Sequence, residues 1–201
     1  MSAERYRPQL VFDVGGVLAA NLDRFWSTLA QAEGLDRAGL RGRYKAEIGS
    51  GLWSGAVAEK KFWEWLDAVC PATGSEEAAR LLRSVLTPLP ALDRLEAWSR
   101  SADIHILSNH VAAWILPLFA GVEDRISSMT ISSEAGCYKP GARIFELAAA
   151  GLAPGDVCFV DDTPGNLEAA RGFGWETLLA DEAGEWTLGL DAWLQRQTAR
   201  G

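Results

Sequence analysis

The stretch Leu10-Val11-Phe12-Asp13-Val14-Gly15-Gly16-Val17-Leu18 decides which fold we expect for this chain. Its apolar run ends in a single aspartate, as a buried strand of a parallel sheet does. Two glycines follow, so the backbone can turn sharply there and leave space for a ligand. Ligands of α/β proteins bind at the carboxyl ends of central strands, so we expect Asp13 at a binding site. A buried strand followed by an ordinary turn is the simpler alternative.

The composition restricts the class of protein and its partners. The chain has 201 residues, of which 48% are hydrophobic, as in a globular protein with a full core. Its net charge of −8 argues against nucleic acid and against an anionic membrane as partners. Cys70, Cys137 and Cys158 are far apart and form no paired motif, which fits a reducing compartment. Residues 1–9 do not resemble a signal peptide and no apolar run is long enough to cross a bilayer, so we expect a cytoplasmic protein.

Residues 19–87 have the apolar spacing of helices, with no strand-like run among them. Residues three and four apart predict four helices, at 22–34, 40–49, 62–69 and 76–86. We expect a small helical bundle at 19–87, inserted into a core domain of residues 1–18 and 88–201. The tryptophans at 26, 53, 63 and 65 are expected in the bundle's core, and those at 53 and 63 can also face the core domain.

From residue 90 onward, strand-like runs alternate with helical patterns. Strands are predicted at residues 104–107, 130–132, 157–160 and 177–179. This alternation is typical of a parallel sheet with helices on both faces. The predicted fold class is therefore α/β, with a Rossmann-like parallel sheet as its core.

Polar residues follow several of the expected strands. Asp13, Ser108 and Asp161 each come directly after a strand, and Lys139 lies in a loop soon after one. The carboxyl ends of parallel strands lie side by side, so these residues are expected to meet in one crevice. Each has a simpler interpretation on its own: the serine as a helix cap, the lysine as a solvated loop charge, and Asp162 as a turn residue.

The available side chains indicate which metal ions the expected site could bind. The chain has only two histidines, so carboxylates must carry any metal chemistry. Carboxylate oxygens suit Mg²⁺, Mn²⁺ or Ca²⁺. In so acidic a chain, an anionic substrate needs local positive charge or a bound cation.

The order and spacing of these residues resemble the haloacid dehalogenase (HAD) superfamily, in the subgroup with a helical cap inserted after the first strand. The resemblance extends from about Leu10 to Leu179. Four stretches carry it: 12–18, 106–109, 138–140, and 159–162 with Gly165-Asn166 after it. The resemblance implies the HAD fold, with residues 19–87 as the cap. It also implies a hydrolase, most simply a phosphatase of a small phosphorylated metabolite such as a sugar phosphate.

The resemblance implies a role for each motif residue. Asp13 would be the nucleophile and form an aspartyl-phosphate that water then hydrolyses. Ser108 and Asn109 would bind the phosphate, together with the following helix N-terminus. Lys139 would bind the substrate and neutralise the charge that Asp13 shares with the phosphoryl oxygens.

The resemblance also implies a cofactor. Mg²⁺ would be held by Asp13, Asp162 and the backbone carbonyl of Gly15, with Asp161 in the outer shell of the metal. Without the cation, the three carboxylates would repel one another.

Gly15 departs from the family pattern. Phosphatases of the family usually have a second aspartate at this position, which protonates the leaving alcohol. General acid catalysis is typically worth ~10²–10⁴ in rate. Three explanations are open. A metal-bound water or His110 donates the proton, or the substrate has a leaving group that needs less help, such as an anomeric or acyl phosphate, or the enzyme is weak or not a phosphatase at all. We favour the second.

Two other functions stay open at this stage. A metal-independent 2-haloacid dehalogenase uses the same Asp13 nucleophile, but it has no need of the pair Asp161-Asp162. Such enzymes usually have an aromatic residue where Gly15 stands and an arginine near the start of the cap, for which Arg24 is the close candidate. A non-catalytic binding domain is supported only by the missing acid.

Overall fold

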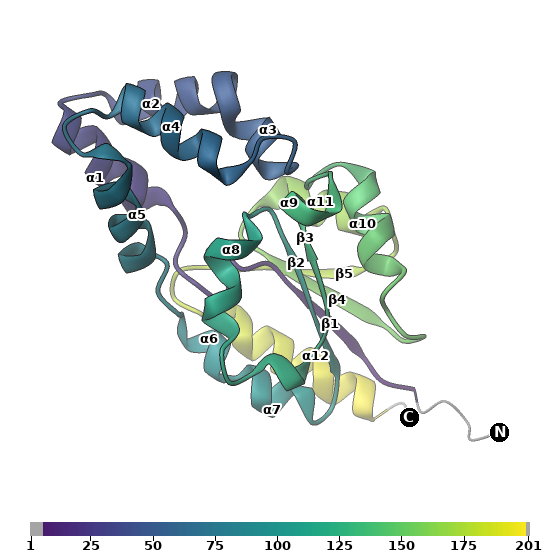
Figure 1. The fold of residues 1–201 in the computed structure, drawn as a ribbon. Helices are drawn as coiled ribbons and strands as arrows, with labels where there is room; N and C mark the ends of the chain where they lie inside the picture. The colour runs from purple at the N-terminus through teal and green to yellow at the C-terminus, as the bar shows by residue number, and fades with distance from the viewer. Residues whose placement is uncertain (1–5, 200–201) are drawn as a thin grey trace.

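The computed structural model describes residues 6–199, and its central element is a five-stranded sheet (Figure 1). The strands are β1 (Gln9–Phe12), β2 (Asp103–Ser108), β3 (Ile126–Ile131), β4 (Val157–Asp161) and β5 (Glu176–Leu179). They lie in the order β3-β2-β1-β4-β5, and every neighbouring pair is parallel. The predicted central strand and the predicted α/β fold with a Rossmann-like parallel sheet are therefore confirmed.

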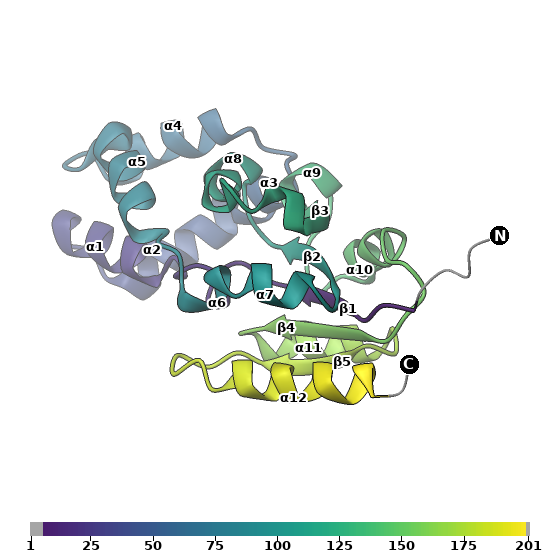
Figure 2. The same ribbon diagram turned by 90° about the horizontal axis from the view of Figure 1, so that it is seen from below.

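Helices cover both faces of the sheet, because side chains along β1 alternate between two hydrophobic clusters. One face is covered by α6 (Pro90–Asp93), α7 (Leu95–Ser99) and α12 (Trp186–Thr198), the last of which runs alongside the sheet in Figure 2. The other face is covered by α10 (Ala142–Ala149) and α11 (Pro164–Arg171).

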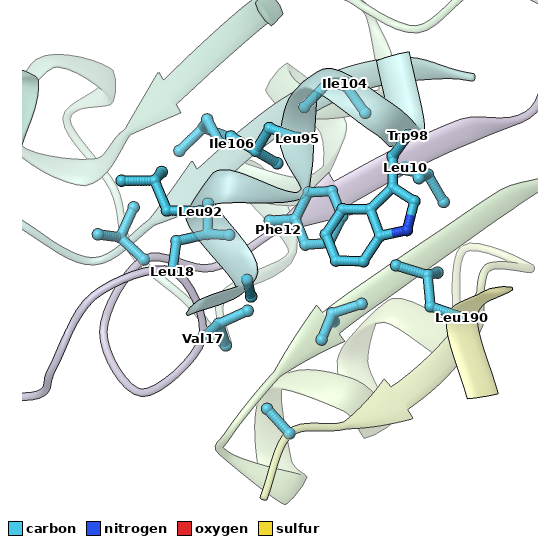
Figure 3. Close-up of a cluster of buried hydrophobic side chains, with 14 of the residues drawn as sticks. Leu10, Phe12, Val17, Leu18, Leu92, Leu95, Trp98, Ile104, Ile106 and Leu190 are labelled. Atoms are coloured by element: carbon cyan, nitrogen blue, oxygen red, sulfur yellow. The ribbon is translucent and has the colours of Figure 1, made fainter. Parts of the chain in front are cut away.

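On the first of these faces, Phe12 lies at the centre of the core (Figure 3). Its ring stacks on Trp98 with the centroids 5.3 Å apart and an angle of 15° between the planes. Val11, the residue before it, belongs to the cluster on the opposite face. Burial on both faces explains why this strand reads as a continuous apolar run.

The helices between β1 and α6 form a separate group beyond the carboxyl ends of the strands (Figures 1 and 2). They are α1 (Asp23–Glu33), α2 (Arg37–Tyr44), α3 (Ser50–Trp53), α4 (Glu59–Val69) and α5 (Gly74–Val85). These helices share their own hydrophobic cluster, which includes Phe25, Leu29, Leu66 and Leu82.

Two chain segments connect this group to the sheet, and they run side by side. The Ala20 amide donates to the Thr87 carbonyl at 2.9 Å, and the Leu89 amide donates to the Leu18 carbonyl at 2.9 Å. This pairing supports our proposed division into a cap at 19–87 and a core of 1–18 and 88–201.

The remaining short elements lie along the chain between the longer ones. They are α8 (Ala112–Ile115) and α9 (Ser132–Ala135), a π-helical turn over Lys45–Gly49, and 3-10 turns over Leu116–Phe119 and Glu123–Arg125. No helix among residues 6–199 has both the length and the apolar character that crossing a membrane requires.

Some predicted boundaries are wrong. The helix expected to stop at Gly49 continues through a π-helical turn into α3. Gly49 has φ −59°, which any helical residue adopts, whereas Gly34 has φ 63° and does end α1. The third strand begins at Ile126 rather than at 130, and Ser132 belongs to α9.

The last helix, α12, has no counterpart among the sequence predictions. Its buried residues Trp186, Leu190, Trp193 and Leu194 have helical spacing, so a signal was present. They complete the core on the face that contains Phe12.

Candidate active site

Three carboxylates meet at the carboxyl edge of the sheet. Asp13 follows β1 directly, Asp161 is the last residue of β4, and Asp162 comes next. One ligand oxygen from each lies within 4.8 Å of the others. They meet because β1 and β4 are parallel neighbours, so their carboxyl ends coincide. The expected encounter between the first-strand aspartate and the later acidic pair is present in the structure.

Lys139 lies between two of these carboxylates. Its Nζ is 3.1 Å from Asp13 Oδ1 and 2.6 Å from Asp161 Oδ2, and it donates to the Leu107 carbonyl at 2.9 Å. Its side chain has no exposed surface, so it is not the solvated loop charge of the simpler interpretation. Two of its three N–H donors form hydrogen bonds, to Asp161 and to the Leu107 carbonyl, and the contact with Asp13 is an ion pair.

Asn109 holds the backbone of Lys139 in place. Its Nδ2 donates to the Lys139 carbonyl at 2.8 Å, and the Lys139 amide donates to its Oδ1 at 2.8 Å. This reciprocal pair assigns Asn109 to positioning the lysine loop, and its direct contact with substrate stays a prediction.

Asp161 is fully buried and hydrogen-bonded on both oxygens. It accepts from the Thr163 amide at 2.7 Å and from Asn166 Nδ2 at 3.0 Å, in addition to Lys139. A carboxylate with so many protein partners suits the predicted place in the outer shell of a metal. The sequence analysis gives Asn166 no role of its own, beyond its place after the motif at 159–162. A polar residue in the first turn of the helix after the strand was the available signal.

Asp162 is half-buried, and its position depends on two neighbours. Thr163 Oγ1 donates to its Oδ1 at 3.0 Å, so the threonine hydroxyl does not cap α11. Gly16 has φ +74°, and a Cβ there would overlap the carboxylate, lying 2.8 Å from Asp162 Cγ. Gly16 therefore leaves the space that Asp162 occupies, a role that sequence reasoning did not assign.

Ser108 ends β2 beside these carboxylates and is almost completely buried. It is not a helix cap, because α8 begins only at Ala112. Its Oγ is buried without a hydrogen-bond partner in the part of the chain that the structure describes. A buried, unsatisfied hydroxyl costs about 1–3 kcal/mol, so its natural partner is a ligand or a water.

The electrostatics of the cluster favour a cation. Burial raises the pKa of Asp161, and the neighbouring charge of Asp13 raises it further. Burial also raises the pKa of Asp162. One buried ammonium against three carboxylates leaves negative charge in excess, which a divalent ion would balance. An all-oxygen donor set of this kind fits Mg²⁺.

A family model for haloacid dehalogenase-like hydrolases matches residues 10–174. The chain belongs to this family. All four motif stretches lie within the matched residues, so the resemblance to the HAD superfamily is confirmed, and membership of the capped subgroup stays a prediction. No curated protein sequence matches the chain.

Solved structures share the fold of this HAD-like hydrolase. A HAD family enzyme of Bacteroides thetaiotaomicron aligns with a TM-score of 0.74 at 20% identity, over 89% of this chain and 96% of that one. That enzyme has also been solved in complex with magnesium and inorganic phosphate. A HAD-like family hydrolase of Porphyromonas gingivalis aligns with a TM-score of 0.72 at 22% identity, over 94% and 98%. An L-2-haloacid dehalogenase aligns with a TM-score of 0.60 at 18% identity, over 86% and 83%.

Gly15 of this HAD-like hydrolase lies in the turn after β1 and forms a β-bridge with Ala19. A Cβ at Gly15 would meet no other atom within 4 Å, so the position has room for a side chain that the chain does not supply. Its carbonyl as a metal ligand stays a prediction.

His110 is buried between two tryptophans close to Ser108. Its ring centroid is 5.5 Å from that of Trp53, in the helical group, and 5.7 Å from that of Trp114, in α8. Burial lowers the pKa of His110 to about 4, and its Nδ1 has no partner among residues 6–199. At neutral pH it is uncharged and a poor proton donor. The contact of Trp53 with the core confirms the expected position of that tryptophan.

Proposed function

We propose that this HAD-like hydrolase is a Mg²⁺-dependent phosphatase of a small phosphorylated metabolite. The observation that carries the proposal is the cluster of Asp13, Asp161 and Asp162, in which a buried lysine contacts the first two. A phosphatase needs that arrangement, because a nucleophilic carboxylate and an anionic phosphate approach each other only when positive charge is present. The magnesium and phosphate complex of the Bacteroides thetaiotaomicron enzyme supports the same function.

Asp13 is the proposed nucleophile. Its Oδ1 lies 3.1 Å from Lys139 Nζ and accepts from the Val14 amide at 2.7 Å, two contacts that fix the rotation of the carboxylate. An Asp13 oxygen would attack phosphorus as the bond between phosphorus and the leaving oxygen breaks. Water would then attack the aspartyl-phosphate, release inorganic phosphate and restore Asp13.

The surrounding residues bind and orient the phosphate. The unpartnered hydroxyl of Ser108 would donate to a phosphoryl oxygen. Lys139 would neutralise Asp13, and its hydrogen bonds to Asp161 and the Leu107 carbonyl leave one N–H donor for the substrate. Asp13, Asp162 and the Gly15 carbonyl would hold Mg²⁺, which supplies the positive charge that an anionic substrate needs.

The leaving group is proposed to need little protonation. Gly15 has no acid to offer, and the lowered pKa of His110 leaves it neutral. An anomeric sugar phosphate or an acyl phosphate has a leaving group of this kind.

A panel of phosphorylated metabolites, tested with and without Mg²⁺, examines the proposal. We expect phosphate release that requires Mg²⁺ and is abolished in Asp13→Asn. Release that persists in Asp13→Asn would overturn Asp13 as the nucleophile. Halide release from 2-haloacids without Mg²⁺ would identify a dehalogenase instead. The arginine named for that alternative, Arg24, is exposed on α1.

A further inference from the structure

A cavity of about 330 Å³ lies in the helical group and is closed on one side by Tyr138. Its other walls come from α1, α2, the π-helical turn and α3. Its volume is at the lower end of the range for small-molecule sites. None of the functional residues assigned so far lines it.

Two residues that line the cavity are linked to residues of the active site. Tyr138 directly precedes Lys139, whose ammonium contacts Asp13. Trp53, which also lines the cavity, has its ring centroid 5.5 Å from that of His110, two residues after Ser108. The chain that lines the cavity is thus continuous with the chain that would hold the phosphate.

The walls combine aromatic rings with positive charge. The centroids of Trp26 and Tyr44 are 4.7 Å apart, and Trp53 lies 6.2 Å from Tyr44 with its edge toward the ring. Arg41 and Lys45 also line the cavity, and no acidic residue does.

The two cations are not neutralised by their surroundings. Arg41 Nη1 lies 3.0 Å from Asp23 Oδ1, but Arg37 shares the same carboxylate oxygen. Lys45 forms no ion pair within residues 6–199. In a chain of net charge −8, this local excess of positive charge favours an anionic ligand.

Tyr44 provides a second, independent indication of a ligand. It is only 5% exposed, and its hydroxyl is buried without a hydrogen-bond partner among the described residues. Burial raises its pKa, so the hydroxyl stays protonated and is available as a donor. The π-helical turn begins at the next residue, and such turns are frequent at functional sites.

We propose that this cavity binds the leaving-group part of the substrate, and that this part has a planar or apolar body with a second anionic group. The inference rests on the proposed phosphatase function and narrows its substrate class. Arg41 and Lys45 would pair with the anion, a carboxylate or a second phosphate. The Tyr44 hydroxyl would donate to it, and the tryptophans would pack against the body.

Three aryl phosphates test this selectivity: phenyl phosphate, 4-carboxyphenyl phosphate and 1,4-phenylene bisphosphate. We expect kcat/KM at least tenfold higher for one of the two compounds with a second anionic group than for phenyl phosphate, mainly through KM. Whichever compound is preferred distinguishes a carboxylate from a second phosphate. Arg41→Gln and Lys45→Gln should each reduce the preference several-fold. Arg43→Gln is the matched control, because Arg43 lies on the same helix, pairs with Glu47 and does not line the cavity.

Tyr44→Phe separates binding from structure. Removing an unsatisfied buried hydroxyl should leave Tm unchanged or raise it, while the preference for the compound with a second anionic group falls. A lower Tm with an unchanged preference would indicate a purely structural role and count against the proposal.

The outcomes distinguish this inference from the proposed function. If phenyl phosphate is hydrolysed with Mg²⁺, its hydrolysis requires Asp13, and it is as good a substrate as the compounds with a second anionic group, the inference fails and the phosphatase stands. If no phosphate is hydrolysed, quenching of tryptophan fluorescence by 4-hydroxybenzoate, with phenol as the control, still decides the cavity. Binding of 4-hydroxybenzoate that weakens in Arg41→Gln supports it, and equal binding of the two compounds overturns it.

Discussion

Replacing Gly16 by alanine would disturb the proposed metal site through a single methyl group. Gly16 has φ +74°, a left-handed conformation that costs alanine roughly 1–2 kcal/mol. Its Cβ would overlap the Asp162 carboxylate and lie 2.8 Å from Asp162 Cγ, well inside the ~3.5–4.0 Å of a normal contact. The carboxylate must therefore move by roughly 1 Å, given those contact distances.

The size of the effect follows from the geometry of the cation. Mg²⁺ requires near-ideal octahedral ligands, so a displaced carboxylate weakens its binding. Changes in the outer shell of a metal typically cost 10–100-fold in affinity, so we expect Gly16→Ala to lose at least ~10-fold. The backbone strain alone should lower Tm by roughly 2–8 °C in a chain of this length.

Two measurements and one control decide this prediction. Calorimetric titration with Mg²⁺ gives the affinity, and thermal unfolding without Mg²⁺ gives the strain. Gly15→Ala is the matched control, because a Cβ there meets nothing within 4 Å, and we expect it to bind Mg²⁺ as the wild type does. Wild-type Mg²⁺ affinity in Gly16→Ala would refute the assignment of Asp162 as a ligand.

Two further predictions concern the missing acid and the buried histidine. Gly15→Asp should raise the rate on simple alkyl phosphates by up to ~10²–10⁴, because the position has room for the side chain, and unchanged rates would count against an activated natural leaving group. Burial lowers the pKa of His110 from its ordinary 6.5 to about 4 in the folded protein. On acidification the unfolded chain therefore binds the proton at a higher pH than the folded chain does. The free energy of unfolding falls as the pH decreases from 6.5 toward 4. Between pH 7 and pH 5 this amounts to roughly 2 kcal/mol of stability, which urea unfolding should find in the wild type and not in His110→Gln. An equal loss of stability in both proteins would show that His110 is not the group responsible.

The sequence was sufficient to predict the sheet and which residues lie at its edge. The apolar run before Asp13 forms β1, and the runs before Ser108 and Asp161 form β2 and β4. Each run is local, and parallel strands place their carboxyl ends together, so the encounter of these residues follows from pattern alone. The absence of an acidic side chain at position 15 was also predictable, because the sequence itself gives the residue as glycine.

Other features depend on contacts between distant segments. The sequence alone does not distinguish a buried Lys139 from a surface charge. Its burial between Asp13 and Asp161 depends on how its loop packs, and Asn109, which directly follows β2, holds that loop. The space that Gly16 leaves for Asp162 is likewise invisible in a list of residues.

The cavity in the helical group shows most clearly the difference between what the sequence predicts and what only the packing decides. Sequence periodicity predicted the helix that carries Tyr44, because apolar spacing reports which face of a helix is buried, but it ended that helix at Gly49, before Trp53. It did not indicate that Tyr138, far along the chain, closes a cavity against them, or that the Tyr44 hydroxyl has no partner. Local pattern determines which elements form, while only their packing in three dimensions decides which polar groups remain free for a ligand.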